Sequence, residues 1–327
     1  MDFFKPPFCS KKLVVASESP YASIVGLEVA RIGGNEVDVA VATSLALALA
    51  IPHLGGLGGD FFALVMDENG RVHCMNGSGY APKRQSIDFM VGRGFREMPQ
   101  EGPLSITVPG MVDALYELWR RFGSVEWKRI VNTVAEHFER GVPVSVTLAE
   151  AVSKYSDKLS KDPGSRAVYL GRGWEKPGGE YRPAEMVKAL RLLAEDPRAF
   201  YEGDIAVKVA EYVQSVGGVL DFEDLKMYRA EWCSPIHVDA FGARFYEVPP
   251  NSQGVSTLQL LLLADRLGIP GSAESAERLK ESLRLFRAVY RIRDAYVTDP
   301  RFMPVPVEKL LDFGFLSEAL RGPEASA

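Results

Sequence analysis

The sequence contains no apolar stretch long enough to cross a membrane. A spanning helix needs about 18 or more consecutive, mainly apolar residues. The longest candidate, residues 37–52, is interrupted by an aspartate, a threonine and a serine, so we predict a buried helix there. A positive charge excess is also absent, because the formal net charge is −5. Nucleic acids and anionic membranes attract basic surfaces, and we therefore expect neither as a partner.

Cysteine and histidine are scarce and scattered. The three cysteines, Cys9, Cys74 and Cys233, are too few and too far apart for a disulfide framework or a zinc site. Cys74 lies in a predicted buried strand, where a thiol behaves as a small hydrophobic group. The four histidines show no metal-ligand spacing and are interpreted as structural. The sequence therefore predicts no metal and no other cofactor.

The first residues show no secretory pattern. MDFFKPPFCSKK lacks a basic segment followed by an apolar one, so the expected location is the cytoplasm. The composition, 46% hydrophobic and 25% charged, is ordinary for a soluble globular protein. No internal repeat or linker divides the 327 residues, which predicts a single domain over 1–327.

The most distinctive stretch present is a glycine-rich hairpin over residues 55–82. Residues 61–66 form a continuous apolar run, which is typical of a strand buried on both faces. Residues 67–70 supply a tight turn, and the chain then runs back as a partner strand. Glycines cluster at both open ends of this hairpin, at 55–59 and 77–79. Such glycines indicate positive φ or a close approach by a backbone or ligand, so each cluster is either a structural corner or a loop lining a site.

The remainder of the chain alternates buried strand candidates with helix candidates, which indicates a layered α/β or α+β architecture. Residues 161–182 are rich in glycine, lysine and aspartate with little periodicity. We interpret them as an exposed loop, with a flap close to a substrate as the alternative. Residues 322–327 are small and lack apolar anchors, which predicts a flexible tail.

Several further motifs occur in a fixed order along nearly the whole chain. They are residues 16–23, Gly33-Gly34-Asn35 with Asp38, residues 55–65, Val108-Pro109-Gly110, residues 200–203, Gly217-Gly218 with Asp224-Leu225 and Tyr228, residues 249–254, and Arg293 with Asp299-Pro300. Each motif alone is weak. Together they resemble the large subunit of the γ-glutamyltranspeptidase family of N-terminal nucleophile hydrolases.

This resemblance implies an α+β fold, a four-layer αββα sandwich shared between two subunits cut from one precursor. It also implies that the nucleophile is an N-terminal threonine on the smaller, companion subunit, activated by its own α-amino group. The catalytic residue would then lie outside this chain. On this interpretation residues 322–327 adjoin the processing site, and residues 1–327 form the large-subunit half of the enzyme.

One position departs from the pattern of the family's transpeptidases. Those enzymes carry an Arg-Glu pair before an Ala-Pro, and the arginine holds the α-carboxylate of the substrate. Here Ser78 stands in the place of that arginine, ahead of Ala81-Pro82. A serine cannot offer a carboxylate the bidentate fork of a guanidinium. With Asn-Gly-Ser-Gly at 76–79 and Pro-Asn-Ser-Gln-Gly at 250–254, the chain resembles the family branch that includes oxamate amidohydrolase-like proteins. This resemblance and the missing arginine disfavour glutathione as a substrate.

Seven residues are candidates for positioning a substrate. They are Ser78, Gly79 and Tyr80 at the hairpin exit, Arg84 shortly after it, and Asn251, Ser252 and Gln253 in a later loop. Each has a structural alternative: Ser78 as a turn residue that satisfies its own backbone, Tyr80 as a core residue, and Arg84 as a solvated surface arginine.

The expected function is hydrolysis or transfer of a γ-glutamyl or smaller amide through an acyl-threonine intermediate. The expected partners are the companion small subunit and a small-molecule amide, with the oligomeric state left open. The alternative is a binding or scaffold protein that keeps the fold without the chemistry.

Overall fold

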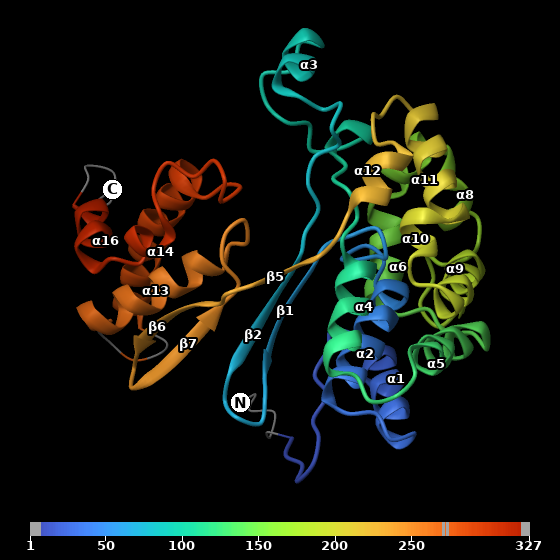
Figure 1. The fold of residues 1–327 in the computed structure, drawn as a ribbon, viewed down its shortest axis with the longest axis horizontal. Helices are drawn as coiled ribbons and strands as arrows, with labels where there is room; N and C mark the ends of the chain where they lie inside the picture. Colours follow the sequence, from blue (N-terminus) through green and yellow to red (C-terminus); the bar gives the residue numbers. More distant parts are fainter. Residues whose placement is uncertain (1–7, 270–271, 273–274, 322–327) are drawn as a thin grey trace. The chain divides into compact units, whose positions relative to one another are not determined.

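The computed structural model describes residues 8–269, 272 and 275–321, and divides them into two compact units. The helical unit comprises residues up to 61 together with 77–230. The mixed unit comprises residues 62–76 together with 231 onward. The chain passes between the units three times, after Phe61, after Asn76 and after Ala230. Figure 1 shows the order of the elements along the chain.

The described part of the helical unit contains mainly helices and two very short strands. In chain order these are α1 (Pro20–Arg31), α2 (Glu36–Ala50), α3 (Ile87–Gly92), a 3-10 turn (Pro103–Ser105), α4 (Met111–Phe122), α5 (Trp127–Glu139), β3 (Val142–Pro143), α6 (Val146–Lys154), α7 (Ser156–Lys161), α8 (Pro163–Tyr169), β4 (Glu180–Tyr181), α9 (Ala184–Glu195), α10 (Ala199–Glu202), α11 (Asp204–Ser215) and α12 (Phe222–Met227).

Helix α2 is the centre of the helical unit and confirms the buried helix predicted over 37–52. It packs against α1, α4 and α5. Leu45 and Leu49 have no exposed surface, as expected for a helix that is apolar nearly all round. A helix this buried cannot leave the N–H groups of its first turn without partners. Its N-terminus therefore needs a polar anchor.

Asp38 is that anchor and is itself fully buried. It forms a capping box with Asn35, whose side chain accepts from the N–H of Asp38 while the Asp38 carboxylate accepts from the N–H of Asn35 at 3.0 Å. The same carboxylate accepts the Ser124 hydroxyl at 2.6 Å and the Val125 N–H at 3.1 Å. Asp38 thus joins the start of α2 to the loop after α4.

Residues 161–182 differ from the predicted exposed loop. They contain α8, which begins after Asp162 caps the N–H of Ser165, and the short strand β4. Trp174 and Tyr181 are each only 3% exposed and pack edge to face with ring centroids 4.6 Å apart. Because these two rings are buried, the stretch packs against the rest of the helical unit. Its glycines and lysines are nevertheless typical of a loop.

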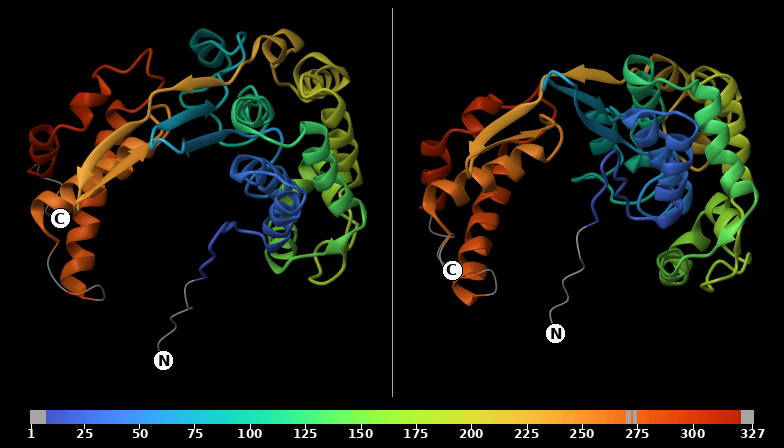
Figure 2. Two further views of the ribbon diagram at one scale, coloured as in Figure 1. Left: turned by 60° about the horizontal axis from the view of Figure 1, so that its bottom comes forward. Right: turned by 90° about the horizontal axis from the view of Figure 1, so that it is seen from below.

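The mixed unit contains most of the described strands and the last four helices. Its elements are β1 (Phe61–Met66), β2 (Val72–Gly77), β5 (Glu231–Cys233), β6 (Ile236–Ala240), β7 (Ala243–Glu247), α13 (Gly254–Leu267), α14 (Ala276–Tyr296), α15 (Val307–Leu310) and α16 (Phe313–Leu320). Strands β1, β2 and β5 form one sheet in that order, and β6 pairs antiparallel with β7. Helix α13 packs on the β6–β7 ribbon (Figure 2), and its Leu258 and Leu263 belong to a core shared with Leu285 of α14.

Strand β1 is not buried on both faces in this chain, contrary to the sequence prediction. Its residues alternate between half-buried and exposed. Phe62 and Leu64 are each 38% exposed and Met66 is 66% exposed. The continuous apolar run therefore leaves one face of β1 without cover among the described residues.

The described chain is of the α+β class and mostly helical, as predicted at that coarse level. None of the described helices is both long and apolar enough to span a bilayer. The single-domain assignment stays a prediction. The tail predicted at residues 322–327 lies outside the described residues.

Replacing Asp38 with alanine tests whether this carboxylate holds α2 to the loop after α4. The change leaves buried N–H and hydroxyl donors without an acceptor, which we expect to lower the free energy of unfolding by about 3 kcal/mol. Urea denaturation of the purified protein measures this. Asp157→Ala, which removes an exposed carboxylate from α7, should stay within about 0.5 kcal/mol; equal effects of the two changes would contradict the assignment.

Candidate functional site

Two backbone segments approach each other closely at the exit from β2. A Cβ atom at Gly79 would overlap the carbonyl oxygen of Val108, and one at Gly110 would overlap the carbonyl oxygen of Gly77. The Val108 N–H donates to the Tyr80 carbonyl at 2.9 Å. Close approach, one of the two reasons predicted for the glycines at 77–79, is therefore what Gly77 and Gly79 provide. We call residues 77–80 the glycine corner.

Ser78 is held at this corner through its backbone. Tyr228, just after α12, donates its hydroxyl to the Ser78 carbonyl at 3.0 Å. The Tyr228 ring stacks on Tyr201, with centroids 5.6 Å apart, and lies 5.8 Å from the ring of Tyr80. The hydroxyl of Tyr80 donates to the Asp224 carbonyl at 2.9 Å. Tyr80 is half-buried in this stack, so its packing role, the structural alternative, is the one that the contacts support.

A buried charge network braces the same region from α4. Asp113 is 3% exposed and accepts from Arg198 at 2.6 Å and from the Ala230 N–H at 2.7 Å. Arg198 also pairs with Glu202 at 2.8 Å and lies over the ring of Tyr201. The Arg198 guanidinium lowers the pKa of the Glu202 carboxyl. These contacts fix where the chain leaves the helical unit after Ala230.

Asp60 brings a negative charge to the glycine corner, and the sequence analysis did not single it out. Its Oδ1 accepts from the Gly79 N–H at 3.3 Å. Partial desolvation raises the pKa of the Asp60 carboxyl, and the hydrogen bond from Gly79 opposes that rise. Among the described residues, Asp60 forms no ion pair. Its signal in the sequence was a carboxylate placed directly between the glycine run and an apolar strand.

The glycine run at 55–59 behaves differently from the glycine corner. Nothing among the described residues lies within 4 Å of a Cβ placed at Gly55, Gly56 or Gly58, and none of the three has a positive φ. The run is hydrogen-bonded at both ends: the Gly55 N–H donates to the Ile51 carbonyl at 3.3 Å, and the Gly59 carbonyl accepts the N–H groups of Gly110 and Met111 at 3.1 and 3.0 Å. At Gly55, Gly56 and Gly58 the described chain therefore shows neither a positive φ nor a close approach by another group.

The later candidates belong to the mixed unit. Asn251 accepts from the side chain of Asn76 at 3.0 Å. Ser252 donates to the Val248 carbonyl at 2.7 Å and accepts the Gly254 N–H, which makes it a turn-forming residue. Gln253 accepts from Arg293 at 3.0 Å. These three side chains therefore shape the loop ahead of α13.

Arg84 lies apart from the contacts above. It is exposed and forms no ion pair with a described residue. Its role as a substrate-binding cation stays a prediction. No group of three or more histidine, cysteine, aspartate or glutamate side chains among the described residues could hold a metal ion.

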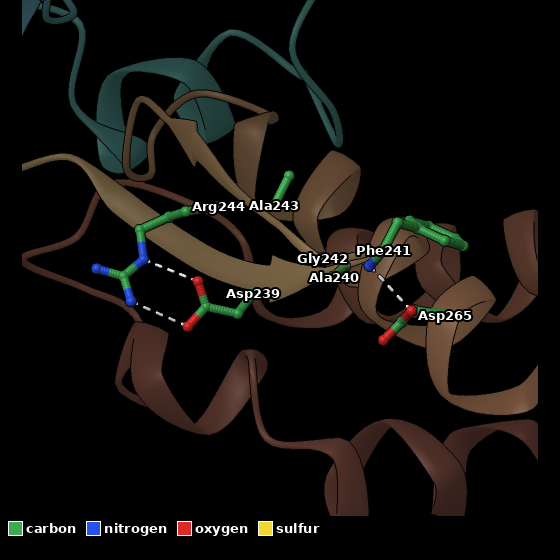
Figure 3. Close-up of a pocket in the computed structure, with 7 residues that line it drawn as sticks. All are labelled: Asp239, Ala240, Phe241, Gly242, Ala243, Arg244 and Asp265. Atoms are coloured by element: carbon green, nitrogen blue, oxygen red, sulfur yellow. Dashed lines mark hydrogen bonds and ion pairs between the residues drawn. The ribbon is translucent and has the colours of Figure 1, made fainter.

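A cavity of about 470 Å³ lies at the β6–β7 turn of the mixed unit and contains none of the predicted site residues. Figure 3 shows that its polar groups pair with one another. Arg244 forms a two-pronged ion pair with Asp239, at 2.8 and 3.0 Å, and the Phe241 N–H donates to Asp265 at 2.9 Å. Because these groups already satisfy each other, we do not assign this cavity as the substrate site.

Comparison with solved structures defines the class of fold. The chain superposes on γ-glutamyltranspeptidase from Helicobacter pylori with a TM-score of 0.89 at 23% identity, covering 96% of this chain and 93% of that one. It superposes on cephalosporin acylase from Bacillus halodurans with a TM-score of 0.86 at 30% identity, covering 97% of this chain and 62% of that one. The fold is therefore that of these N-terminal nucleophile hydrolases.

Sequence comparison then gives the family. The pattern of the family described as Gamma-glutamyltranspeptidase matches residues 22–321, and the chain belongs to this family. A glutathione hydrolase-like YwrD proenzyme of Bacillus subtilis is 35% identical over 92% of this chain and 58% of its own length. An oxamate amidohydrolase proenzyme of Klebsiella pneumoniae is 29% identical over 89% of this chain and 56% of its own length. The chain thus spans little more than half the length of these relatives.

Replacing Gly79 with alanine tests the close approach at the glycine corner. The new Cβ would meet the Val108 carbonyl, so the backbones must separate, and we expect a loss of at least about 3 kcal/mol in the free energy of unfolding. Thermal and urea denaturation measure this. Gly92→Ala is the matched control, because Gly92 ends α3 with open space around it. Similar stability of the two variants would rule out the close contact.

Proposed function

We propose that this chain is the large-subunit half of an autoprocessed amide hydrolase or acyltransferase whose nucleophile is the N-terminal threonine of a companion subunit. The observation that carries the proposal is membership of the γ-glutamyltranspeptidase family combined with a span of little more than half of its relatives. Two of those relatives are named as proenzymes, which supports processing of a longer precursor.

The exposed face of β1 supports a missing layer. An apolar strand with Phe62, Leu64 and Met66 at the surface leaves hydrophobic area in water that a second sheet could cover. The αββα sandwich proposed for the whole enzyme supplies such a layer from the companion subunit. The open faces of Gly55, Gly56 and Gly58 support the same view, because glycine there allows a companion backbone or a substrate to come close.

The proposed reaction uses the threonine hydroxyl to attack the amide carbonyl, with its own α-amino group as base. The oxyanion that forms needs donors held in place before the reaction. Collapse of this intermediate breaks the C–N bond and releases the amine, which takes up the proton from the hydroxyl, and leaves an acyl-threonine ester. Water or another amine then attacks the ester, takes the acyl group and restores the threonine hydroxyl. In this scheme the chain contributes walls and positioning groups, chiefly Ser78 and Gly79, with Asn251, Ser252 and Gln253 as further candidates.

The charge at the glycine corner supports a substrate without a free carboxylate at this position. Ser78 offers a neutral hydroxyl, and Asp60 adds a carboxylate bonded to the neighbouring Gly79 N–H. A second carboxylate brought close to Asp60 would be repelled. We therefore propose a small or uncharged amide in preference to a γ-glutamyl compound. The cytoplasmic location remains a prediction beside this proposal.

The companion subunit should be required for activity. Residues 1–327 expressed alone are expected to hydrolyse no amide and to aggregate or bind a hydrophobic dye, because the β1 face is uncovered. Co-expression with the downstream part of the gene should restore a monodisperse, active protein. Size-exclusion chromatography and an amide hydrolysis assay make the comparison.

A precursor in which alanine replaces the first threonine of the companion serves as the control for this experiment. It should remain one uncut, inactive chain. An uncut, inactive alanine precursor beside a cleaved, active parent supports the enzyme. If the parent is cleaved and still hydrolyses no amide, the scaffold alternative is correct. If the alanine precursor is cleaved normally, an outside protease does the processing.

The substrate preference should follow the charge at the glycine corner. Without a bidentate arginine, donors with a free α-carboxylate should lose about ten- to a hundredfold in kcat/KM. We therefore expect γ-glutamyl-p-nitroanilide to be a poorer substrate than its α-amide derivative and simple acyl amides. Oxamate, which is small but carries a carboxylate, is added to the panel to separate the effect of size from the effect of charge. Ser78→Arg should improve turnover of the γ-glutamyl compound, and Asp60→Asn, which keeps an acceptor for Gly79, should do so several-fold.

Two further variants control this panel. Glu211→Gln removes one negative charge from the exposed side of α11 and should leave the ratio between charged and uncharged donors unchanged. Arg84→Gln tests the remaining cation: a loss of γ-glutamyl turnover would mean that Arg84 holds the carboxylate. Efficient turnover of γ-glutamyl-p-nitroanilide by the unmodified enzyme would overturn the preference while leaving the amide hydrolase proposal intact.

A further inference from the structure

Two of the three cysteines meet between strands β2 and β5 of the mixed unit, although they are 159 positions apart in the sequence. Cys74 of β2 and Cys233 of β5 are direct partners in the antiparallel register. Their sulfur atoms are 2.8 Å apart and share a hydrogen bond. Residues directly opposite in an antiparallel pair have Cα atoms about 4.5–5.5 Å apart, which lies within the range that a disulfide bridges. The backbone therefore already places both thiols for a covalent link.

The two thiols differ in access and acidity. Cys74 is fully buried, whereas Cys233 is partly exposed. The hydrogen bond between the two side chains, in which the Cys233 thiol donates to the Cys74 sulfur, lowers the pKa of the Cys233 thiol. The same bond, together with burial, raises the pKa of the Cys74 thiol. Since the thiolate is the nucleophile in thiol chemistry, an oxidant reaches the more reactive of the two sulfurs first.

We propose that Cys74 and Cys233 form a reversible, redox-responsive disulfide in this protein, with low-molecular-weight disulfides or hydroperoxides as the oxidants. The proposal is independent of which amide the enzyme cleaves. It also goes beyond the sequence interpretation of Cys74 as a small hydrophobic group, because that interpretation leaves its pairing with Cys233 out of account.

The reaction with a small disulfide RSSR proceeds in two exchanges. The Cys233 thiolate attacks one sulfur of RSSR, which forms a mixed disulfide and releases one thiolate RS⁻. This step removes the hydrogen bond to a Cys233 thiolate that raised the pKa of Cys74. Cys74 then loses its proton and attacks the Cys233 sulfur, releasing the second RS⁻. In total two protein thiols are oxidised by two electrons, and RSSR is reduced to two molecules of RSH.

A disulfide between Cys74 and Cys233 would constrain the chain near two of the places where it passes between its units. Cys74 lies three residues before Gly77 and Cys233 three residues after Ala230, close to two of the places where the chain passes between its units. A disulfide here closes a loop of about 160 residues, which restricts the unfolded chain strongly. We expect the oxidised protein to melt about 10 °C higher than the reduced protein.

The experiment treats the purified, processed protein with bis(2-hydroxyethyl) disulfide, which contains no amide and so cannot be a substrate. All samples carry Cys9→Ser, because Cys9 is exposed and would cross-link separate molecules. We expect the loss of two titratable thiols, a peptide pair joined through residues 74 and 233 in mass spectrometry, a higher Tm, and full reversal by dithiothreitol. Dilute hydrogen peroxide should give the same linked peptides.

Two variants separate the roles of the sulfurs. Cys74→Ala should stop at the mixed disulfide on Cys233, and Cys233→Ser should leave Cys74 unmodified. The parent carrying Cys9→Ser decides the question even if either variant fails to fold. Absence of the 74–233 linked peptide after treatment, with both thiols still titratable or Cys233 held only as a mixed disulfide, would overturn the proposal. Loss of amide hydrolysis in every sample would count against the proposed function and leave this result unaffected.

Discussion

The architecture around the candidate site depends on a contact between two backbones that only glycine permits. Gly77 and Gly79 on one side, and Gly110 on the other, have no room for a side chain. Because the segments lie this close, the Val108 N–H reaches the Tyr80 carbonyl and the Gly110 N–H reaches the Gly59 carbonyl. Backbone groups that are buried need such partners. The end of the glycine run, the exit from β2 and the start of α4 are thereby joined at one place.

The junction also determines where two carboxylates, Asp113 and Asp60, are placed. Asp113 lies in the first turn of α4, so the position of this helix sets where Arg198 and the Ala230 N–H find their acceptor. The opposite charges of Asp113 and Arg198 therefore largely neutralise each other within the helical unit. Asp60, on the other segment of the same junction, accepts from the Gly79 N–H and forms no ion pair with any residue that the structure describes. Asp60 therefore places a carboxylate directly beside Gly79 of the corner.

Local patterns predicted part of this arrangement well. The buried helix over 37–52 and the glycine corner depend on composition within a short window, and both were found as α2 and residues 77–80. The prediction of an exposed loop at residues 161–182 was partly wrong. Helix α8 is too short to show a helical period of apolar residues, and Trp174 is buried by residues that are distant in the sequence. The pairing of Cys74 with Cys233 could not be predicted, since nothing local states that β2 lies beside β5.

For the candidate site too, local sequence patterns predicted some features, and others depend on contacts between residues that are distant in the sequence. The sequence named Ser78 and Gly79 as candidates through motif order, and the structure shows which contacts hold their main chain. Their role in binding a substrate stays a prediction. Tyr80 was open between wall and packing, and only its contacts with Tyr228 and the Asp224 carbonyl favour packing. Asp60 was missed because a single carboxylate beside glycines has no period or motif that marks it. Its relevance arises from a contact with Gly79, 19 residues further on.

The glycine corner is held by contacts of its main chain. The glycines and the Tyr228 hydroxyl fix the main chain of residues 77–79, so the side chain at Ser78 can change without altering those bonds. The relatives of this chain are named for different amides, among them glutathione, oxamate and cephalosporins. Under the proposed function, a main chain fixed in this way lets the polar groups at the corner differ between relatives while its backbone contacts are kept.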